Sequence, residues 1–306
     1  MTAFIIRRVL WTIPVLWAIA TVTFLLMHTV PGGPFDRDKE LPATVRQNLE
    51  RKYGLDKPLH EQYVQYMTNL AKGDLGISMR QNRPVTTIIR EGLTVSLQLG
   101  FTAFVFATVF GMSMGLIAAL NHNRPGDYAG VFVATVGSSM PNFILATFLV
   151  IIFSVQLGWT DVLGWEMFNP RKMILPTVAL GILPAAYIAR ISRASMLEVL
   201  GQDYIRTARA KGLSEWAVIA RHTVKNALVP ILTVLGPILA VLVTGSFIIE
   251  TSFAINGVGR HFVGAISSRD YGLIMGTTLF FAVIITFANL AVDILYAFVD
   301  PRIRYG

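Results

Sequence analysis

Residues Arg206–Asn226, "RTARAKGLSEWAVIARHTVKN", form a basic and polar stretch between two long apolar ones. The stretch contains five Lys or Arg residues and a single acidic one, Glu215. The neighbouring stretches Met173–Ala189 and Asn226–Ile249 contain no charged residue. Long uncharged stretches are typical of helices buried in lipid, where a charged side chain is costly. The contrast therefore predicts two membrane-spanning helices joined by a basic connection that lies in water.

The composition of the whole chain also indicates a membrane protein. Of its 306 residues, 54% are apolar and 14% are charged, whereas soluble domains have about 25% charged residues. The net charge of +8 would suit a nucleic-acid partner, but the basic residues fall in the connections between apolar stretches. We therefore predict the lipid bilayer as a partner and no nucleic acid. The absence of cysteine excludes disulfides and thiolate chemistry.

Six stretches are long and apolar enough, or nearly so, to cross a bilayer, which takes about 20 helical residues. The first is too long to be the core of a cleaved signal peptide, which has only about 7–15 residues. We therefore predict an all-α integral membrane protein whose first helix is retained. The six predicted spans are Val9–Val30, Thr94–Leu120, Tyr128–Gly158, Met173–Ala189, Asn226–Ile249 and Tyr271–Val292.

The distribution of basic residues predicts the orientation, because Lys and Arg are enriched in short cytoplasmic loops. With the N-terminus inside, the cytoplasmic segments hold twelve basic residues and the short outer loops hold four. We therefore predict a multi-pass protein of a bacterial or archaeal plasma or inner membrane, with both termini cytoplasmic. The chain then divides into residues 1–30 with the first helix, an outer loop over 31–93, and a core of five helices over 94–306.

The long outer loop is predicted to form a small helical cap. Pro42 and Pro58 can each open a helix, since proline is favoured at the first helical position. The expected helices cover "ATVRQNLERKYG" and "LHEQYVQYMTNLAKG", and the second ends at Gly73. One face of this second helix is apolar at helical spacing, through Leu59, Tyr63, Tyr66, Met67 and Leu70.

Neither a nucleotide-binding P-loop nor a zinc-hydrolase motif is present, since GxxxxGK[ST] and HExxH are absent. We therefore predict a protein that is not an enzyme. Glu250 and Asp293 lie at the ends of the fifth and sixth predicted spans, where a charge is a functional candidate. The alternative is that both lie near the membrane surface and are merely solvated. "GMSMG", Gly111–Gly115, is a GxxxG motif that favours close helix packing.

The basic connection, residues 191–225, is predicted to form an elbow of two short helices that meet at Gly212. Helical spacing of Leu197, Leu200, Tyr204 and Ala208 predicts the first helix. Ser214 can cap the second, which would carry Trp216, Ile219 and Thr223 on one face. By composition alone, an elbow that contacts a protein and a basic hairpin that lies on anionic lipid are equally favoured.

Several motifs resemble those of one transporter family. The connection reads "YIRTARAKGL…ARHTVKNALVP", and "PGGPF", "KGDLG", "SSMPNF", "GSFIIET" and "VDILYAFVDPRIRYG" occur along the rest of the chain. Their order and spacing resemble the permease subunits of bacterial ABC importers of the peptide class, and the first of the two oligopeptide permeases most. Importer permeases at large carry Glu-Ala-Ala six residues before the glycine. Here these positions are Arg206-Thr207-Ala208, so only the elbow and its glycine carry over.

The resemblance implies a type I importer permease with six transmembrane helices that forms half of a translocation pathway for peptides. The implied partners are a second, non-identical permease, two ATPases that use ATP and Mg²⁺, and an extracytoplasmic peptide-binding protein. This chain itself is expected to bind no cofactor or metal. A permease of the same class for another solute, such as a glutathione-like compound, a nickel chelate or a sugar, is an alternative. A stand-alone carrier is less favoured, because no inverted repeat is visible.

The resemblance also implies which residues contact the ATPases. The predicted docking residues are Tyr204, Ile205, Arg206, Ala208, Arg209, Lys211, Gly212 and Leu213. Polar residues within apolar spans are candidates for lining the pathway, with hydrogen bonding between helices as an equal alternative. These are Ser138, Ser139, Asn142, Ser246 and Asn289. The stretch Thr251–Phe262, with Asn256, Gly257 and Gly259, is predicted to dip back at the outer face as a gate, because its glycines permit a tight backbone.

Overall fold

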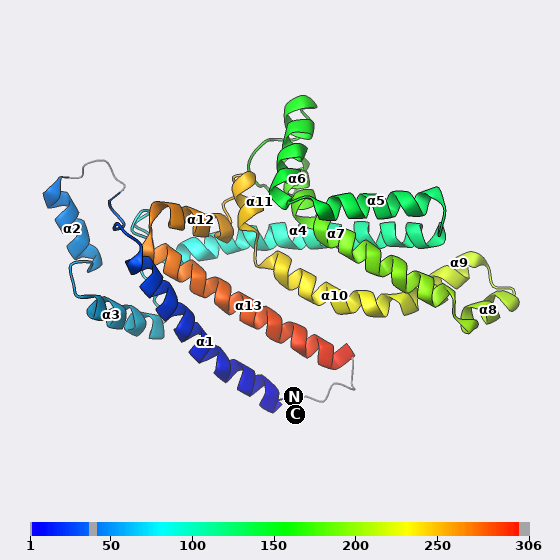
Figure 1. Ribbon diagram of the computed structural model, residues 1–306, viewed down its shortest axis with the longest axis horizontal. Coiled ribbons are helices and arrows are strands. Elements are labelled where there is room, and N and C mark those ends of the chain that lie inside the picture. Colours follow the sequence, from blue (N-terminus) through cyan, green and yellow to red (C-terminus); the bar gives the residue numbers. More distant parts are fainter. Residues whose placement is uncertain (1, 37–41, 300–306) are drawn as a thin grey trace. The chain divides into compact units, whose positions relative to one another are not determined.

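The computed structural model describes residues 2–36 and 42–299, and this part of the chain is mostly helical (Figure 1). Within it, the only pairing of β type is an isolated bridge between Ile77 and Pro84. The helices that are long and apolar enough to cross a membrane, by length and composition, are Ile6–Thr29, Val85–Leu120, Pro170–Leu200, Glu215–Val243 and Tyr271–Leu290. These helices correspond to five of the six predicted spans, which confirms the predicted all-α fold.

The helices in chain order are α1 (Thr2–Thr29), α2 (Ala43–Tyr53), α3 (Leu59–Ala71), α4 (Val85–Leu120), α5 (Pro125–Ser139), α6 (Asn142–Leu149), α7 (Pro170–Leu200) and α8 (Asp203–Ala210). They are followed by α9 (Glu215–Ala217), α10 (Lys225–Val243), α11 (Phe247–Ser252), α12 (Val258–Ser268) and α13 (Tyr271–Val299). Two π-helical segments, η1 (Val150–Gln156) and η2 (Val218–Val224), continue α6 and α9.

The first of two compact units comprises Met1–Ser96 and Asn256–Phe287. The helices predicted in the outer loop are confirmed here as α2 and α3. Tyr63 and Tyr66 of α3 pack on a buried cluster that contains Phe24 of α1 and Met275 of α13. Apolar burial of this kind stabilises by about 25 cal/mol per Å². The tyrosine face of α3 is therefore what fixes this helix to α1.

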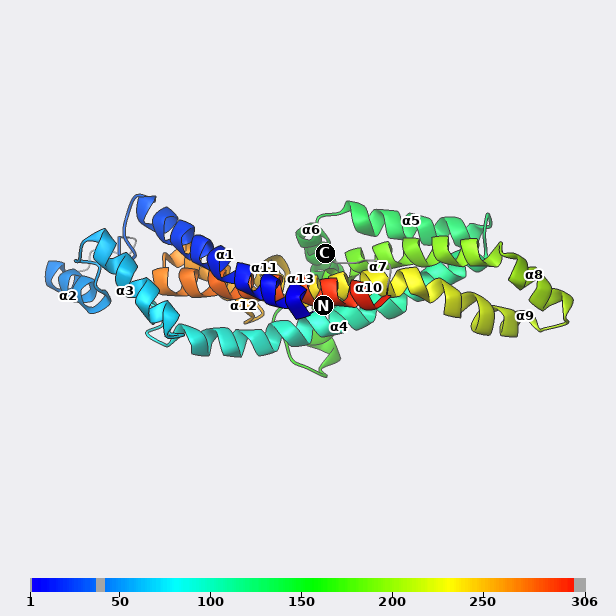
Figure 2. The same cartoon turned by 90° about the horizontal axis from the view of Figure 1, so that it is seen from below.

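In the second unit, Leu97–Ile255 and Ala288–Gly306, α7 packs against α5, α6 and α10. Figures 1 and 2 both show α5 alongside α7. Two glycines let α4 approach α7 closely. A Cβ at Gly111 would lie 2.6 Å from the carbonyl oxygen of Ala185, and one at Gly115 would lie 2.5 Å from Cβ of Ser192. The interpretation of "GMSMG" as a helix-packing motif is confirmed.

The prediction of one continuous third span, Tyr128–Gly158, is wrong. α5 ends at Ser139 and α6 begins at Asn142, and Met140 between them is extended with φ −91° and ψ 131°. Pro141 explains the break, because its ring disfavours helical geometry at the preceding residue and it has no N–H to donate.

The fourth and fifth predicted spans have different bounds in the structure. α7 continues past Ala189 because Arg190–Leu200 contains no glycine or proline to end it. The predicted span Asn226–Ile249 instead belongs to a helical stretch that covers Glu215–Val243. This observed helical stretch ends just before Gly245, whose φ of 87° turns the chain into α11. The second helix of the elbow is therefore the beginning of a long apolar helix.

Candidate functional site

The basic connection folds as an elbow between the end of α7 and the start of α10 (Figure 1). After α8 the chain turns at Gly212, whose φ of 79° lies in the left-handed region that glycine adopts without strain. The hydroxyl of Ser214 then accepts a hydrogen bond from the N–H of Ala217 at 3.4 Å. The predicted turn at Gly212 and the predicted cap at Ser214 are confirmed.

The inner face of the elbow is a small apolar cluster. Ile205 and Ala208 are buried against Val218, with Val199 at the edge of the cluster. We therefore remove Ile205 and Ala208 from the predicted docking residues. A side chain that is 0% exposed, as Ile205 is, cannot enter a groove on another protein. The cluster instead connects α8 to the helix that follows the turn, and full burial of an isoleucine stabilises such a contact by about 1.5–3 kcal/mol.

The outer face of the elbow presents a different set of apolar side chains. Tyr204 and Leu213 are exposed, and Trp216 is 77% exposed. The prediction that Trp216 and Thr223 share a face is wrong, since Thr223 is fully buried. The π-helical segment η2 explains this difference, because its wider turn shifts the side-chain positions away from α-helical spacing. Trp216 is therefore an exposed aromatic residue, whereas Thr223 lies on the buried side of η2.

Two of the predicted cationic contacts are engaged within the elbow. Nε of Arg209 lies 2.8 Å from Oε1 of Glu215, across the turn. Nη1 of Arg206 lies 3.5 Å from Oδ1 of Asp203, and both side chains are largely exposed. Exposed pairs of this kind contribute about 0–1 kcal/mol. Arg206 can therefore exchange its partner for an acidic group on another protein at little cost. Lys211 is exposed as well.

A groove of about 510 Å³ lies in the second unit. Asn142 and Ser246, two of the five predicted pathway residues, are among the residues that line it, together with Pro184, Tyr187 and Pro237. All of its lining residues are uncharged. Within the described part of the chain, the buried Oδ1 of Asn142 accepts no hydrogen bond. The groove therefore has an uncharged and largely apolar wall, and the unpaired Oδ1 of Asn142 is covered by the protein itself.

The other predicted pathway residues do not line this groove. The hydroxyl of Ser139 donates to the carbonyl oxygen of Thr135 at 2.7 Å, and Asn289 is exposed. The side chains of Ser138 and Asp293 lie outside the described part of the chain. The structure therefore brings together only the residues at the two helix breaks, Asn142 after Pro141 and Ser246 after Gly245.

Glu250 is 0% exposed in α11. The alternative that it lies solvated at the membrane surface is therefore wrong, and it remains a functional candidate as a buried carboxyl group.

The predicted gate has a different backbone from the one expected. Gly257 is extended with φ −91° at the start of α12, and Gly259 lies inside that helix, so neither uses the freedom of glycine. The left-handed turn is instead at Ala254, with φ 52°. Oδ1 of Asn256 accepts a hydrogen bond from Nη1 of Arg260 at 2.7 Å.

A buried ion pair in the second unit escaped the sequence analysis. Asp127, at the start of α5, is 2% exposed. Arg193 of α7 donates to both of its carboxylate oxygens, at 2.6 and 2.7 Å. His122 lies 3.3 Å from the same carboxylate. These donors, Arg193 above all, hold the pKa of Asp127 well below its usual range. The pair therefore fixes α5 to α7 next to the end of α7 that leads into the elbow.

Comparison with known proteins identifies the family. Residues 111–305 match the family described as binding-protein-dependent transport system inner membrane component, and residues 1–100 match its N-terminal region. This chain belongs to that family. The permease is similar over 99% of its length to the dipeptide transport system permease protein DppB of Bacillus subtilis, with 45% identity and 98% of that protein covered. It is 42% identical over 100% of both chains to the oligopeptide transport system permease protein OppB of Haemophilus influenzae.

Other similar proteins extend this picture. The glutathione transport system permease protein GsiC of Shigella flexneri is 39% identical to this permease over 100% of both chains. A solved structure of the MetNI methionine ABC transporter is similar in fold, with a TM-score of 0.54 and 18% identity, covering 70% of this permease and 97% of that chain. An amino acid ABC transporter gives a TM-score of 0.53 at 20% identity, covering 71% and 95%. The predicted type I importer permease fold is confirmed.

Proposed function

We propose that this chain is the membrane-spanning subunit of an ATP-driven importer for peptides that an extracytoplasmic binding protein delivers. The observation that carries the proposal is the identity of 42–45% over essentially the whole chain to permeases named for dipeptide and oligopeptide transport. The relative named for glutathione transport has 39% identity, which favours a glutathione-like solute as the second candidate. Both candidates share one architecture, and they differ in the solute that the binding protein delivers.

The groove in the second unit forms this chain's half of the translocation pathway in the proposed function. A pathway for peptides of varied sequence must hold each one weakly, so that it both enters and leaves. The groove has no charged lining residue that would bind or repel a particular side chain. A second, non-identical permease supplies the other half.

The elbow couples this pathway to two cytoplasmic ATPases. Tyr204, Leu213 and Trp216 enter a groove on an ATPase, while Arg206 and Lys211 contact acidic groups at its rim. Because the cluster around Ile205 joins α8 to the helix beyond the turn, the elbow moves as one body together with α7 and α10. ATP and Mg²⁺ are bound by the ATPases, and this chain binds neither. Both termini and the elbow lie in the cytoplasm of a bacterium or archaeon, and residues 31–93 lie outside.

Reconstitution of the permease with its partner proteins in proteoliposomes tests the proposed function. We expect uptake of radiolabelled peptides, and ATP hydrolysis that rises when the loaded binding protein is added. Uptake of glutathione without uptake of dipeptides or longer peptides would favour the second candidate. Uptake that continues without ATPases would contradict the importer assignment and favour a stand-alone carrier.

A matched pair of tryptophan variants tests the proposed docking surface. Trp216→Ala should weaken retention of the ATPases on the purified permease by about thirtyfold, since an aromatic residue at the centre of an interface often contributes about 2 kcal/mol or more. Trp159→Ala is the control, because Trp159 is also highly exposed but lies in the connection between η1 and α7. Equal retention in the two variants would contradict the docking surface.

A further inference from the structure

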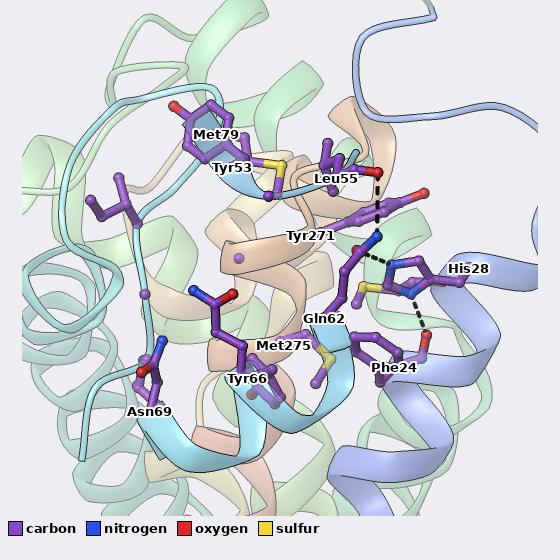
Figure 3. A pocket seen from close by; sticks show the side chains of 17 residues that line it. Phe24, His28, Tyr53, Leu55, Gln62, Tyr66, Asn69, Met79, Tyr271 and Met275 are labelled. Atoms are coloured by element: carbon purple, nitrogen blue, oxygen red, sulfur yellow. Dashed lines mark hydrogen bonds between the residues drawn. The ribbon is translucent and has the colours of Figure 1, made fainter. Parts of the chain in front are cut away.

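A second cavity, of about 180 Å³, lies within the first unit (Figure 3). Its walls come from α1, the end of α2, α3, the start of α13 and the loop that contains Leu75 and Met79. A cavity of about 150 Å³ is large enough to bind a benzene ring in a protein core. This pocket can therefore hold one aromatic or branched aliphatic side chain. It shares no lining residue with the groove in the second unit.

The walls of the pocket are rich in aromatic and methionine side chains. Phe24, Tyr271, Met79 and Met275 surround it (Figure 3). The ring of His28 lies 4.2 Å from that of Phe24 and 5.1 Å from that of Tyr271, measured between centroids. Methionine sulfur makes favourable contacts with aromatic rings and adapts to their shape. This lining therefore favours an apolar ring as the bound group.

The loop that forms one wall is fixed in place before any ligand binds. The carboxylate of Asp270, 1% exposed, accepts hydrogen bonds from the N–H groups of Met79 at 3.0 Å and Arg80 at 3.2 Å, and also from the hydroxyl of Ser78. Gly272 permits the loop to come this close, since a Cβ there would lie 2.4 Å from the carbonyl oxygen of Ile77. A preformed wall reduces the entropy lost on binding.

Side-chain amides of α3 supply the polar part of the pocket. Gln62 is engaged, because its amide donates to the carbonyl oxygens of Leu55 and Lys57 at 3.3 and 2.8 Å. Among the described residues, the amide of Asn69 makes no side-chain hydrogen bond, and the hydroxyl of Tyr66 is buried without a partner. An amide offers both a donor and an acceptor, as a peptide bond does. None of the lining residues is Lys, Arg, Asp or Glu.

We propose that this pocket binds an uncharged peptide segment, holding one aromatic or branched side chain against Phe24 and Met79 and one peptide bond against Asn69. The inference deepens the proposed function and rests on it for the peptide as the source of the segment. The pocket lies on the side of the membrane proposed to be extracytoplasmic, where a peptide leaves its binding protein. A peptide held here is retained beside the permease before it enters the pathway.

The experiment measures binding directly, by saturation-transfer NMR on the purified complex in nanodiscs without ATP. The probe is N-acetyl-L-phenylalaninamide, which carries one aromatic side chain between two amide groups. We expect saturable binding with a Kd of about 1 mM, a usual value for a ligand of this size. N-acetyl-L-phenylalanine has the same ring and a free carboxylate. It should bind at least about tenfold more weakly, because no Lys or Arg lines the pocket to pair with a buried negative charge.

Three variants identify the site of binding. Asn69→Leu should weaken binding of the probe by about fivefold, the effect expected for losing its hydrogen bonds, and Met79→Trp should abolish binding by filling the pocket. Thr68→Leu is the matched control, since Thr68 lies next to Asn69 on α3 but is exposed and does not line the pocket. Thermal unfolding of each complex shows whether a variant has lost its structure, and Asn69→Leu keeps the test open if Met79→Trp unfolds.

The possible outcomes separate the pocket from the transport function. No saturable binding, or equal binding by the control and the Asn69→Leu variant, would overturn the proposal. If the probe does not bind but Met79→Trp weakens docking of the extracytoplasmic binding protein, the pocket is a surface for that protein and the proposal is overturned. If the probe binds as expected but the complex takes up no peptide, the pocket stands and the proposed substrate is wrong.

Discussion

Replacing Gly212 with valine should uncouple the elbow without unfolding the permease. At φ 79° any L-residue other than glycine is strained, and a strained backbone state of this kind costs about 1–3 kcal/mol. A Cβ at Gly212 meets no atom within 4 Å, so steric contact adds nothing to this cost. The turn should open, and α8 should leave the position that the ATPase recognises.

The size of the effect follows from this strain. Since 1.4 kcal/mol is a factor of ten, ATPase docking should weaken by about 5- to 150-fold. The Gly212→Asn variant should lose far less of its affinity for the ATPases, because asparagine enters the left-handed region more readily than other residues. Gly201→Val is a second control in the same connection. Gly201 has an ordinary φ of −80°, and a Cβ there meets its neighbours at 3.5 Å or more.

The assay is the retention of ATPase subunits on the detergent-purified permease, together with peptide-stimulated ATP hydrolysis. Membrane insertion is checked by the amount of permease recovered. We expect Gly212→Val to lose both ATPase retention and peptide-stimulated hydrolysis. Gly212→Asn and Gly201→Val should stay close to the unmodified protein in both measurements. If Gly212→Val docks and hydrolyses normally, the elbow is not the coupling element, and the interpretation of the basic segment as a lipid-surface hairpin regains support.

Three further predictions concern orientation and packing. A cysteine at Gln65 should react with an impermeant thiol reagent applied outside intact cells and one at Glu215 should not, and the reverse pattern would refute the orientation. Gly115→Leu should sharply reduce the yield of folded permease, because its side chain would collide with α7, and a normal yield in gel filtration would contradict this packing. Arg193→Ala should destabilise the permease by about 3 kcal/mol in thermal unfolding, with a smaller loss for Arg193→Lys. Because the folded pKa of Asp127 is lowered, its contribution to stability is fully present above its ordinary pKa and is lost only in stronger acid. If the stability of the unmodified protein fell between pH 8 and pH 5 while that of Asp127→Asn did not, this account of Asp127 would be refuted.

The fold class could be predicted because lipid imposes a rule that sequence displays directly. Every backbone group in a span must be satisfied within the helix, so spans appear as long uncharged stretches. The helix breaks were harder to predict. Pro141 separates α5 from α6, whereas Pro184 and Pro237 lie inside continuous helices. Neighbouring helices decide which proline is tolerated, and a single sequence does not contain their positions.

The candidate site was predictable where its geometry is local. Gly212 and Ser214 act within a few residues of themselves, and the turn and the cap are where the sequence placed them. The exposed face of the elbow was not predictable. Ile205 and Tyr204 are adjacent apolar residues, and only the packing of α8 against Val218 buries one and exposes the other.

The amino-acid sequence by itself determined the helical character of the chain, the basic connection and the turn at its centre, because each depends on residues close together in the chain. Tertiary structure alone decided which distant residues meet. Asp127 and Arg193 are 66 positions apart, and Asn142 at the start of α6 and Ser246 just before α11 line one groove. Pairs such as these form when α5, α6 and α10 pack on α7. The free energy of that packing belongs to whole helix faces, so no single stretch of sequence carries its signal.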